Sequence, residues 1–251
     1  MADPVASAPS IYGWTAKIGL VIPSNNTVIE PECWASVPDM VTVHSARVLS
    51  GGNTPEGIVE MERNAARAVR ELQPGGMSVI AYACLATSLV KGRDWDESIR
   101  ADIVSVTGCP ATTAATATIA AVKTAGATRI GIATPYTQRI GALVAPFFKS
   151  FGLEPLTVRN LDVQDSRTLW KTPPATVREL VLSANSADAE AICILATDLP
   201  TAGVVDALAA EIGKPVVTTN QAILWQCLSL AGAAAAMPAS FLRHAGAEKR
   251  Q

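Results

Sequence analysis

The sequence predicts an α/β protein of two related lobes, each with a parallel sheet that helices cover on both faces. Three observations support this fold class. Apolar segments typical of buried strands alternate with segments of helical periodicity. Three pairs of segments repeat in the same order along the chain. Hydrophobic residues make up 49% of the 251 residues and charged residues only 17%, which is enough apolar side chain for two well-covered sheets.

The internal repeat keeps its spacing as well as its order. Cys84 lies 66 positions after Ile18, and Ala196 lies 66 positions after Ile130. The matched pairs are AKIGLVIPSNNT (16–27) with TRIGIATPYTQR (128–139), VIAYACLATS (79–88) with AICILATDLP (191–200), and GCPATTAAT (108–116) with GKPVVTTNQ (213–221). A repeat of this length indicates two lobes of related structure.

Helical patterns fill the stretches between the predicted strands. A helix is expected over 55–76, where apolar residues recur at helical spacing up to a Pro-Gly-Gly stop. The segments 111–130 and 140–156 each read as helix, glycine and strand, and 174–195 reads as helix and strand. This alternation predicts βαβ crossovers and therefore parallel sheets.

The order of the repeats predicts how the chain is divided. We expect the first lobe to comprise 16–111 plus 218–251, the second lobe to comprise 112–217, and residues 1–15 to form a flexible arm. The first residues lack a basic region followed by an apolar one, so no signal peptide is expected. No apolar run reaches 18 residues. These features predict a cytoplasmic protein that does not associate with membranes.

Charge and residue counts exclude several classes of function. A formal net charge of −2 without a basic run argues against nucleic-acid binding. The five cysteines are irregularly spaced and include no CxxC, which argues against zinc ribbons and a disulfide framework. Only His44 and His244 could supply an imidazole, so metal or His-based chemistry is not expected. Glycine-rich phosphate motifs are absent, and we therefore expect no cofactor.

The repeated landmarks all follow predicted strands. Ligands of parallel sheets bind beyond the carboxyl ends of the strands, where helix N-termini offer free amides. Four such helix starts, near Asn26, Cys84, Tyr136 and Ala196, would form a site for a small anion in one cleft. Helix N-termini also lower the pKa of a nearby thiol. Cys84 is therefore either an activated nucleophile or proton carrier, or a small core residue.

The segments IGLVIPSNNTVIEPE and YACLA resemble the maleate cis-trans isomerases of the aspartate/glutamate racemase superfamily, which also contains arylmalonate decarboxylases. The resemblance runs from about residue 16 to about residue 235, and GKPVVTTNQAILW is typical of the late part of the superfamily. It implies two flavodoxin-like lobes related by a pseudo-two-fold, with a cofactor-free active site between them.

The resemblance also assigns roles to individual residues. Cys84 matches the cysteine that attacks the double bond, Asn26 matches the asparagine that holds a substrate carboxylate, and Tyr136 matches an active-site tyrosine. The implied reaction is isomerisation of a small dicarboxylate such as maleate, and a homodimer or homotetramer is expected. Further residues are expected to bind the substrate: Ser24, Asn25, Thr27, Leu85, Ala86, Thr137, Ser166, Ala196 and Thr197.

Two positions depart from the family pattern. The second family cysteine falls on Ala196, and a common asparagine falls on Ser166. A racemase with two thiols is therefore not expected. Three alternatives stay open beside the isomerase. The protein could be a decarboxylase or other lyase with Cys84 as proton donor, a variant inactive for isomerisation because of Ala196, or a bilobal binding protein that has lost catalysis.

Overall fold

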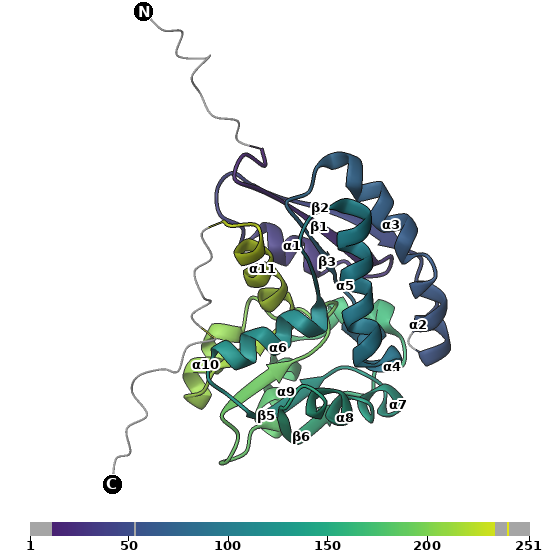
Figure 1. Ribbon diagram of the computed structural model, residues 1–251. Coiled ribbons are helices and arrows are strands. Elements are labelled where there is room, and N and C mark those ends of the chain that lie inside the picture. Colours follow the sequence, from purple (N-terminus) through teal and green to yellow (C-terminus); the bar gives the residue numbers. More distant parts are fainter. Residues whose placement is uncertain (1–11, 53, 234–239, 241–251) are drawn as a thin grey trace, which may run out of the picture.

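The computed structural model describes residues 12–52, 54–233 and 240. The chain forms two four-stranded parallel sheets, one in each lobe, with helices packed around them (Figure 1). The strand orders are β2-β1-β3-β4 and β6-β5-β7-β8, so the two sheets have the same topology. The predicted α/β fold with two related lobes is confirmed.

The first sheet is centred on β1 (Ala16–Pro23) and β3 (Val79–Tyr82). β2 (Val41–Val48) and β4 (Ala111–Thr113) are its edge strands. β3 is buried along its whole length, and β1 is buried at six of its eight positions. Continuous apolar strands of this kind are typical of parallel sheets that are covered on both faces.

The second sheet repeats this arrangement. β5 (Arg129–Thr134) and β7 (Ala191–Ile194) are central, and β6 (Glu154–Asn160) and β8 (Val216–Thr218) form the edges. Ile18 pairs with Val79 in the first sheet, and Ile130 pairs with Ala191 in the second. The two central strands therefore meet in the same register in both lobes, which agrees with the equal spacing of the sequence repeat.

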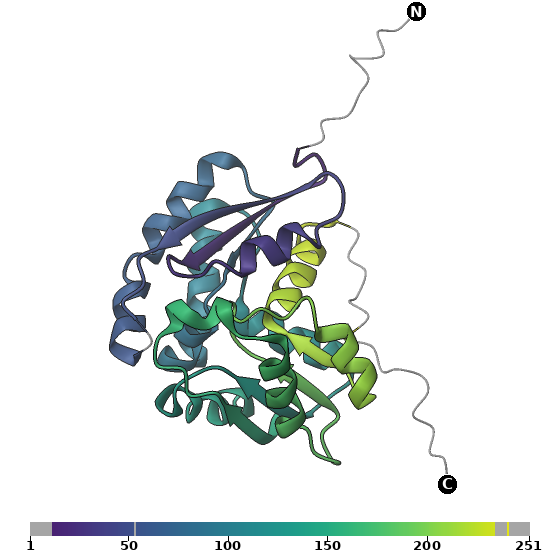
Figure 2. The same cartoon turned by 180° about the vertical axis from the view of Figure 1, so that it is seen from behind.

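The helices connect the strands by crossovers (Figure 2). They are α1 (Ile29–Trp34), α2 (Pro55–Glu62), α3 (Ala65–Leu72), α4 (Leu85–Lys91), α5 (Arg93–Thr107), α6 (Ala114–Thr124), α7 (Gln138–Gly141), α8 (Val144–Lys149), α9 (Pro174–Ala184), α10 (Val205–Ile212) and α11 (Thr219–Leu230), with 3₁₀ turns at Gln73–Gly75 and Ser166–Lys171. The single helix predicted over 55–76 is wrong in one respect, because a turn at residues 63 and 64 divides it into α2 and α3.

The two lobes are joined by an exchange of helices. α6 follows β4 of the first sheet but also packs against β7 and β8 of the second, whereas α11 follows β8 and packs against β3 and β4. α6 and α11 also pack extensively against each other. In the predicted division, residues 1–11 of the 1–15 arm, and residues 234–239 and 241–251 of the first lobe, lie outside the described residues.

Polar contacts of Glu32 on α1 also link the lobes. Its Oε1 accepts hydrogen bonds from the backbone amides of Thr201 (2.6 Å) and Ala202 (2.9 Å). Its Oε2 accepts one from Nδ2 of Asn220 at 2.7 Å. A charged acceptor that satisfies three donors forms strong bonds, so these contacts fix the loop after β7 against the first lobe.

Apolar side chains of the central strands fill the core of both lobes. Among the largest fully buried ones are Ile18, Leu20, Ile80, Ile130 and Ile132. Each such side chain contributes roughly 1.5–3 kcal/mol relative to exposure in water. Within the described ranges, no helix is both long and apolar enough to cross a membrane.

Candidate active site

Cys84 lies at the junction of β3 and α4. β3 ends at Tyr82, and Cys84 has extended backbone dihedrals (φ −136°, ψ 99°) directly before the first residue of α4. This geometry turns the chain from strand to helix at the carboxyl edge of the sheet, where parallel sheets place ligand sites. The residue is 8% exposed, and that exposed surface faces a cavity.

The cavity has a small inner chamber of about 40 Å³. The first lobe contributes Cys84, and the second contributes Tyr136, Ser166, Thr197 and Asp198. The other lining residues are Pro23, Asn25, Ser50, Gly52, Ile58, Met61, Leu85, Ala86 and Leu169. One water needs roughly 10–15 Å³ on this measure, so the inner chamber has room for a few atoms beside the sulfur.

An outer chamber of about 640 Å³ adjoins the inner one. The two share Asn25, Ser50, Gly52 and Ser166, and the outer chamber adds Ser24, Gln164, Asp165 and Arg167. Arg167 is paired with Asp165 at 2.8 Å, and both side chains are exposed. A ligand therefore reaches Cys84 through a wide, polar entrance.

The expectation that the helix N-terminus lowers the Cys84 pKa is wrong for this structure. Burial raises the pKa of the thiol, and the negative charge of Asp198 raises it further. The Thr87 hydroxyl and the backbone amides of Ala86 and Thr87 act in the opposite direction but do not outweigh burial. Desolvation penalises the thiolate more than the short helix stabilises it, so the resting residue is a neutral thiol.

Tyr136 lies in the second lobe, two residues after the end of β5. It is 5% exposed, and its backbone amide donates to Oγ1 of Thr134 at 3.2 Å. Burial raises its pKa well above the ordinary value, and the charges of Asp198 and Cys84 add to this effect. Tyr136 is therefore a neutral phenol that can donate a hydrogen bond at any physiological pH.

Asp198 is a cavity residue that the sequence analysis did not select. It is partly exposed to the inner chamber, and burial raises the pKa of its carboxyl group to about 6. The sequence did contain a signal for this residue, because Asp198 lies in the segment 191–200, which the repeat matches to the Cys84 segment 79–88. Only the structure shows that a carboxyl group at this position shares a chamber with the sulfur.

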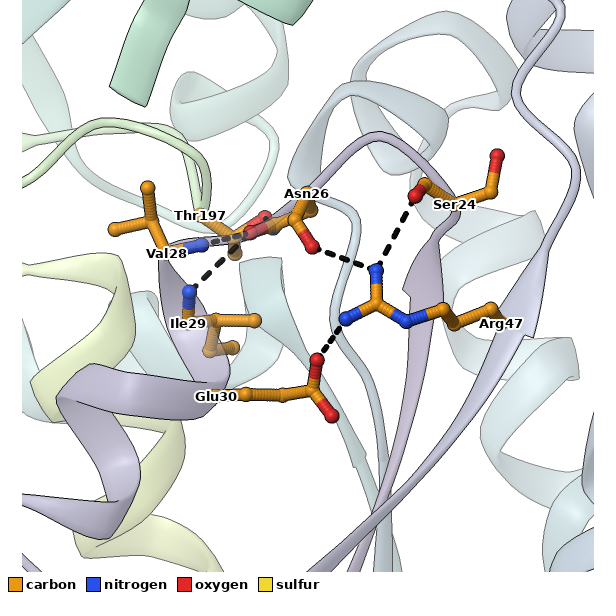
Figure 3. A network of polar contacts seen from close by, with 7 residues as sticks. All are labelled: Ser24, Asn26, Val28, Ile29, Glu30, Arg47 and Thr197. Carbon is orange, nitrogen blue, oxygen red and sulfur yellow. Dashed lines mark hydrogen bonds and ion pairs between the residues drawn. The ribbon is translucent and has the colours of Figure 1, made fainter. Parts of the chain in front are cut away.

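The Asn26 side chain forms hydrogen bonds to other residues of the protein and does not line the inner chamber. Its Oδ1 accepts hydrogen bonds from the backbone amides of Val28 (2.9 Å) and Ile29 (3.2 Å), and its Nδ2 donates to Oγ1 of Thr197 at 2.9 Å (Figure 3). It therefore satisfies free amides at the start of α1 and bridges the two lobes. The neighbouring Asn25 lines both chambers instead.

Arg47 on β2 holds the loop that carries these asparagines. Its Nη1 donates to the carbonyl oxygens of Ser24 (3.2 Å) and Asn26 (2.8 Å), and its Nη2 pairs with Glu30 (Figure 3). A planar guanidinium that binds two carbonyls and a carboxylate is an effective clamp for a loop. The segment between β1 and α1 is thereby fixed at the edge of the cleft.

Thr197 provides a test of the contact between the lobes. Its hydroxyl accepts from Asn26 and donates to the carbonyl oxygen of Ala83 at 3.1 Å, so Thr197→Val leaves two buried polar groups unpaired. We expect a loss of about 1–3 kcal/mol in the free energy of unfolding, measured by urea denaturation. Thr27→Val, at an exposed position in the same loop region, should change it by less than about 0.5 kcal/mol. Equal effects of the two variants would contradict the proposed link.

The other predicted site residues fall into two groups. Leu85 and Ala86 line the inner chamber, Ser24 lines the outer one, and Ser166 lines both and accepts a hydrogen bond from Nδ2 of Asn25 at 3.0 Å. The remaining predicted residues lie elsewhere: Thr27 is exposed, Thr137 caps α7 and borders a separate surface hollow, and Ala196 is buried without lining the chamber.

Sequence reasoning also missed the apolar wall of the inner chamber. Ile58 and Met61 come from α2, and Leu169 comes from the 3₁₀ turn Ser166–Lys171. Their spacing in α2 marks an apolar helix face, but such a face more often packs on the core. Nothing in the local pattern distinguishes a helix face that packs on a sheet from one that closes a cavity.

The predicted fourth helix start, after Ala196, is not present. Residues 195–204 form turns and irregular chain, and α10 begins only at Val205. Pro200 disfavours helix at the residue before it and removes a backbone donor. Ala196 itself has a φ of 104°, a conformation that non-glycine residues rarely adopt. The helix starts near Asn26, Cys84 and Tyr136 are therefore present, whereas the fourth is not.

Comparisons with known proteins identify relatives over most of the chain. The chain is 25% identical over 226 residues to a maleate isomerase of Geobacillus stearothermophilus, covering 84% of this chain and 90% of that protein. It is 26% identical over 223 residues to the arylmalonate decarboxylase of Bordetella bronchiseptica, covering 88% and 92%.

A solved structure and a family model extend these matches. The structure of the maleate isomerase Iso from Pseudomonas putida S16 superimposes with a TM-score of 0.85 at 24% identity, covering 91% of this chain and 98% of that one. The model of the arylmalonate decarboxylase family matches from residue 18 to residue 241, a range that begins within β1 and includes the other seven strands and every residue that lines the inner chamber. The chain therefore belongs to the arylmalonate decarboxylase family.

Proposed function

We propose that this protein is a cofactor-independent cis-trans isomerase of a small dicarboxylate of the maleate type, with Cys84 as the nucleophile. The observation that carries this proposal is the position of Cys84, a buried residue that lines a small chamber between the lobes. Curated relatives named maleate isomerase match most of the chain. A structurally similar maleate cis-trans isomerase variant from Nocardia farcinica carries a covalently bound succinylcysteine intermediate.

The proposed reaction begins when a base takes the proton of the Cys84 thiol, and the same base returns that proton to the sulfur at the end. The Cys84 thiolate adds to one alkene carbon, and the π electron pair moves to the neighbouring carbon and into its carboxylate. The central bond is then single and can rotate. Return of the electron pair expels the thiolate and leaves the trans alkene. Every bond that forms in the first half breaks in the second, so the reaction consumes nothing.

Neutral donors would hold the two carboxylates of the substrate. Tyr136 and the hydroxyls of Ser50 and Ser166 line the inner chamber, and the amide of Asn25 lines both chambers. No lysine, arginine or histidine lines the inner chamber, whose residues all lie in the described part of the chain. Preformed dipoles in a small chamber stabilise the negative charge that develops on the substrate when the thiolate adds. A carboxylate contact by Asn26 would require it to release Thr197.

One observation favours decarboxylation of a substituted malonate as the second candidate. The thiol of Cys84 has a raised pKa, so at neutral pH it is a better proton donor than nucleophile. After carbon dioxide leaves, the thiol would protonate the resulting enediolate carbon. The inner chamber contains one cysteine, as a reaction with a single proton donor requires.

The two candidates are separated by their products. The protein is incubated with maleate, and fumarate is followed by its ultraviolet absorbance and by NMR. Parallel incubations with phenylmalonate are assayed for carbon dioxide and phenylacetate. Fumarate together with a Cys84 adduct of one maleate mass in the intact-protein mass spectrum would support the isomerase. Phenylacetate without fumarate would support the decarboxylase, and the absence of both products would contradict the proposal.

A further inference from the structure

The second lobe directs one carboxyl group into the chamber that holds the Cys84 sulfur. Asp198 follows Ala196, whose φ of 104° turns the chain sharply after β7. Within this turn, the hydroxyl of Thr197 reaches the first lobe and donates to the carbonyl oxygen of Ala83, next to Cys84. The same turn places Asp198 on the wall of the inner chamber. Unusual backbone conformations of this kind are concentrated at functional sites.

The chamber contains only three titratable side chains, all within the described residues: Cys84, Tyr136 and Asp198. The charge of Asp198 acts on both of the other two. Arg167, a cation of the outer chamber, is already paired with Asp165. Asp198 therefore faces a thiol and a phenol but no cation, which is an unfavourable site for a carboxylate that had only a structural role. The residue as a whole is partly exposed.

Thiol and carboxyl group are thus coupled across the chamber. Burial holds the pKa of Asp198 near 6 and raises that of Cys84, so near neutral pH the pair carries one proton and one negative charge. A pair that shares one proton is suited to pass it from one partner to a substrate and back.

On the basis of the proposed function, we infer that Asp198 is the acid–base residue of the second lobe. It takes the proton of the Cys84 thiol and delivers it to the alkene carbon next to the one that sulfur attacks. Asp198 lies two residues beyond Ala196, the position at which the resemblance places a second family cysteine.

The proposed steps balance in protons and in electron pairs. The S–H bond breaks as an O–H bond forms on Asp198, and the sulfur–carbon bond forms as the π bond breaks. The electron pair on the neighbouring carbon takes the proton from Asp198, which gives a succinyl thioether on Cys84 and restores the carboxylate. After rotation, Asp198 removes a proton from that carbon, the π bond re-forms, the sulfur leaves, and Asp198 returns the proton to the thiolate.

The test compares Asp198→Asn with the wild type in two independent measurements. Turnover of maleate should fall by about 10²–10⁴-fold, because a general acid–base residue is lost. Alkylation of Cys84 by iodoacetamide at pH 8, read by peptide mass spectrometry, should become about threefold to tenfold faster, because a negative charge beside the thiolate is removed. Asp188→Asn, an exposed acid before the other end of β7, should change neither.

The pH dependence gives a third measurement. In the wild type, the Cys84 alkylation rate should show an inflection near pH 6, because ionisation of Asp198 above this pH opposes the thiolate. The inflection should be absent in Asp198→Asn. Unfolding would also expose the buried thiol and speed its alkylation, so the inference requires two further results for Asp198→Asn: a melting temperature like that of the wild type, and alkylation of the buried Cys193 and Cys227 as slow as in the wild type.

Each remaining outcome contradicts the inference. Unchanged turnover with faster alkylation would show that Asp198 is only a nearby charge. Lost turnover with unchanged or slower alkylation would show a positioning role. If the wild type acts on neither maleate nor phenylmalonate, the proposed function fails, and the alkylation measurements alone decide on Asp198: the inflection and its loss support coupling to Cys84, and identical profiles overturn it.

Discussion

Cys84→Ser is expected to reduce turnover of maleate by at least about 10³-fold and to abolish the covalent adduct. A serine hydroxyl in the same chamber is a far weaker nucleophile and acid than a thiol, and a proton shared with Asp198 cannot activate it to the same extent. Initial rates of fumarate formation measure the first effect, and intact-protein mass spectrometry measures the second. Because Cys84 is a small buried residue, the exchange should leave the unfolding midpoint within a few degrees of the wild type.

Cys109→Ser is the matched control. Cys109 is half-buried in the turn before β4 and does not line either chamber, so its replacement should leave turnover within about twofold. Fumarate formation by Cys84→Ser at a rate close to that of Cys109→Ser would mean that the thiol is not the nucleophile. In that case the rates at which Cys84→Ser and Cys109→Ser form phenylacetate from phenylmalonate test whether Cys84 is the proton donor of a decarboxylase.

Asp96→Ala is expected to destabilise the first lobe by about 3 kcal/mol or more. The Asp96 side chain is fully buried, and its oxygens accept hydrogen bonds from the hydroxyls of Ser88, Thr113 and Thr116, each at 2.6 Å. It thereby ties α5 to α4 and to the start of α6. Removing the carboxylate leaves three hydroxyl groups, two of them fully buried, without the acceptor to which they donate. For a protein of this size the melting temperature should fall by about 6–12 °C, measured by circular dichroism.

Asp94→Ala is the control for this prediction. Asp94 lies in the same first turn of α5, so both variants remove one acidic residue near the helix N-terminus, but the Asp94 side chain is exposed. Its loss should cost less than about 1 kcal/mol, the contribution of a surface carboxylate at a helix start. Similar melting temperatures for the two variants would show that the buried hydroxyl cluster contributes little. α4 begins directly after Cys84, so Asp96→Ala should also lower turnover.

The two acids at 94 and 96 also illustrate the limits of sequence reading. Both precede an apolar helical pattern, and the sequence favours a solvated cap for the pair. The structure confirms this only for Asp94, because Asp96 faces α4 and the β4–α6 junction. Which of two neighbouring acids is buried depends on the rotation of the helix about its axis. That rotation is set by packing partners far away in the chain.

The fold itself was predictable from the sequence because its signals are local or repeated. Apolar strand segments, glycine stops and helical spacing are properties of a few neighbouring residues, and the 66-residue spacing in both halves relates one lobe to the other. The position of Cys84 at a strand end follows from the same local pattern. These features can be predicted without knowledge of tertiary contacts, because chain direction alone places the carboxyl ends of parallel strands at one edge of the sheet.

The sequence by itself therefore determined the two parallel α/β lobes, the strand end that carries Cys84 and the family to which its motifs point. The tertiary structure alone decided that Asn26 bridges to Thr197 and that Asn25 and Asp198 line the chamber. It also decided that burial raises the pKa of the Cys84 thiol, whereas the helix start alone predicted a lowered pKa. The physical reason is that burial and electrostatic coupling are sums over atoms from distant segments. Periodicity in one segment carries no information about how closely the other lobe approaches it.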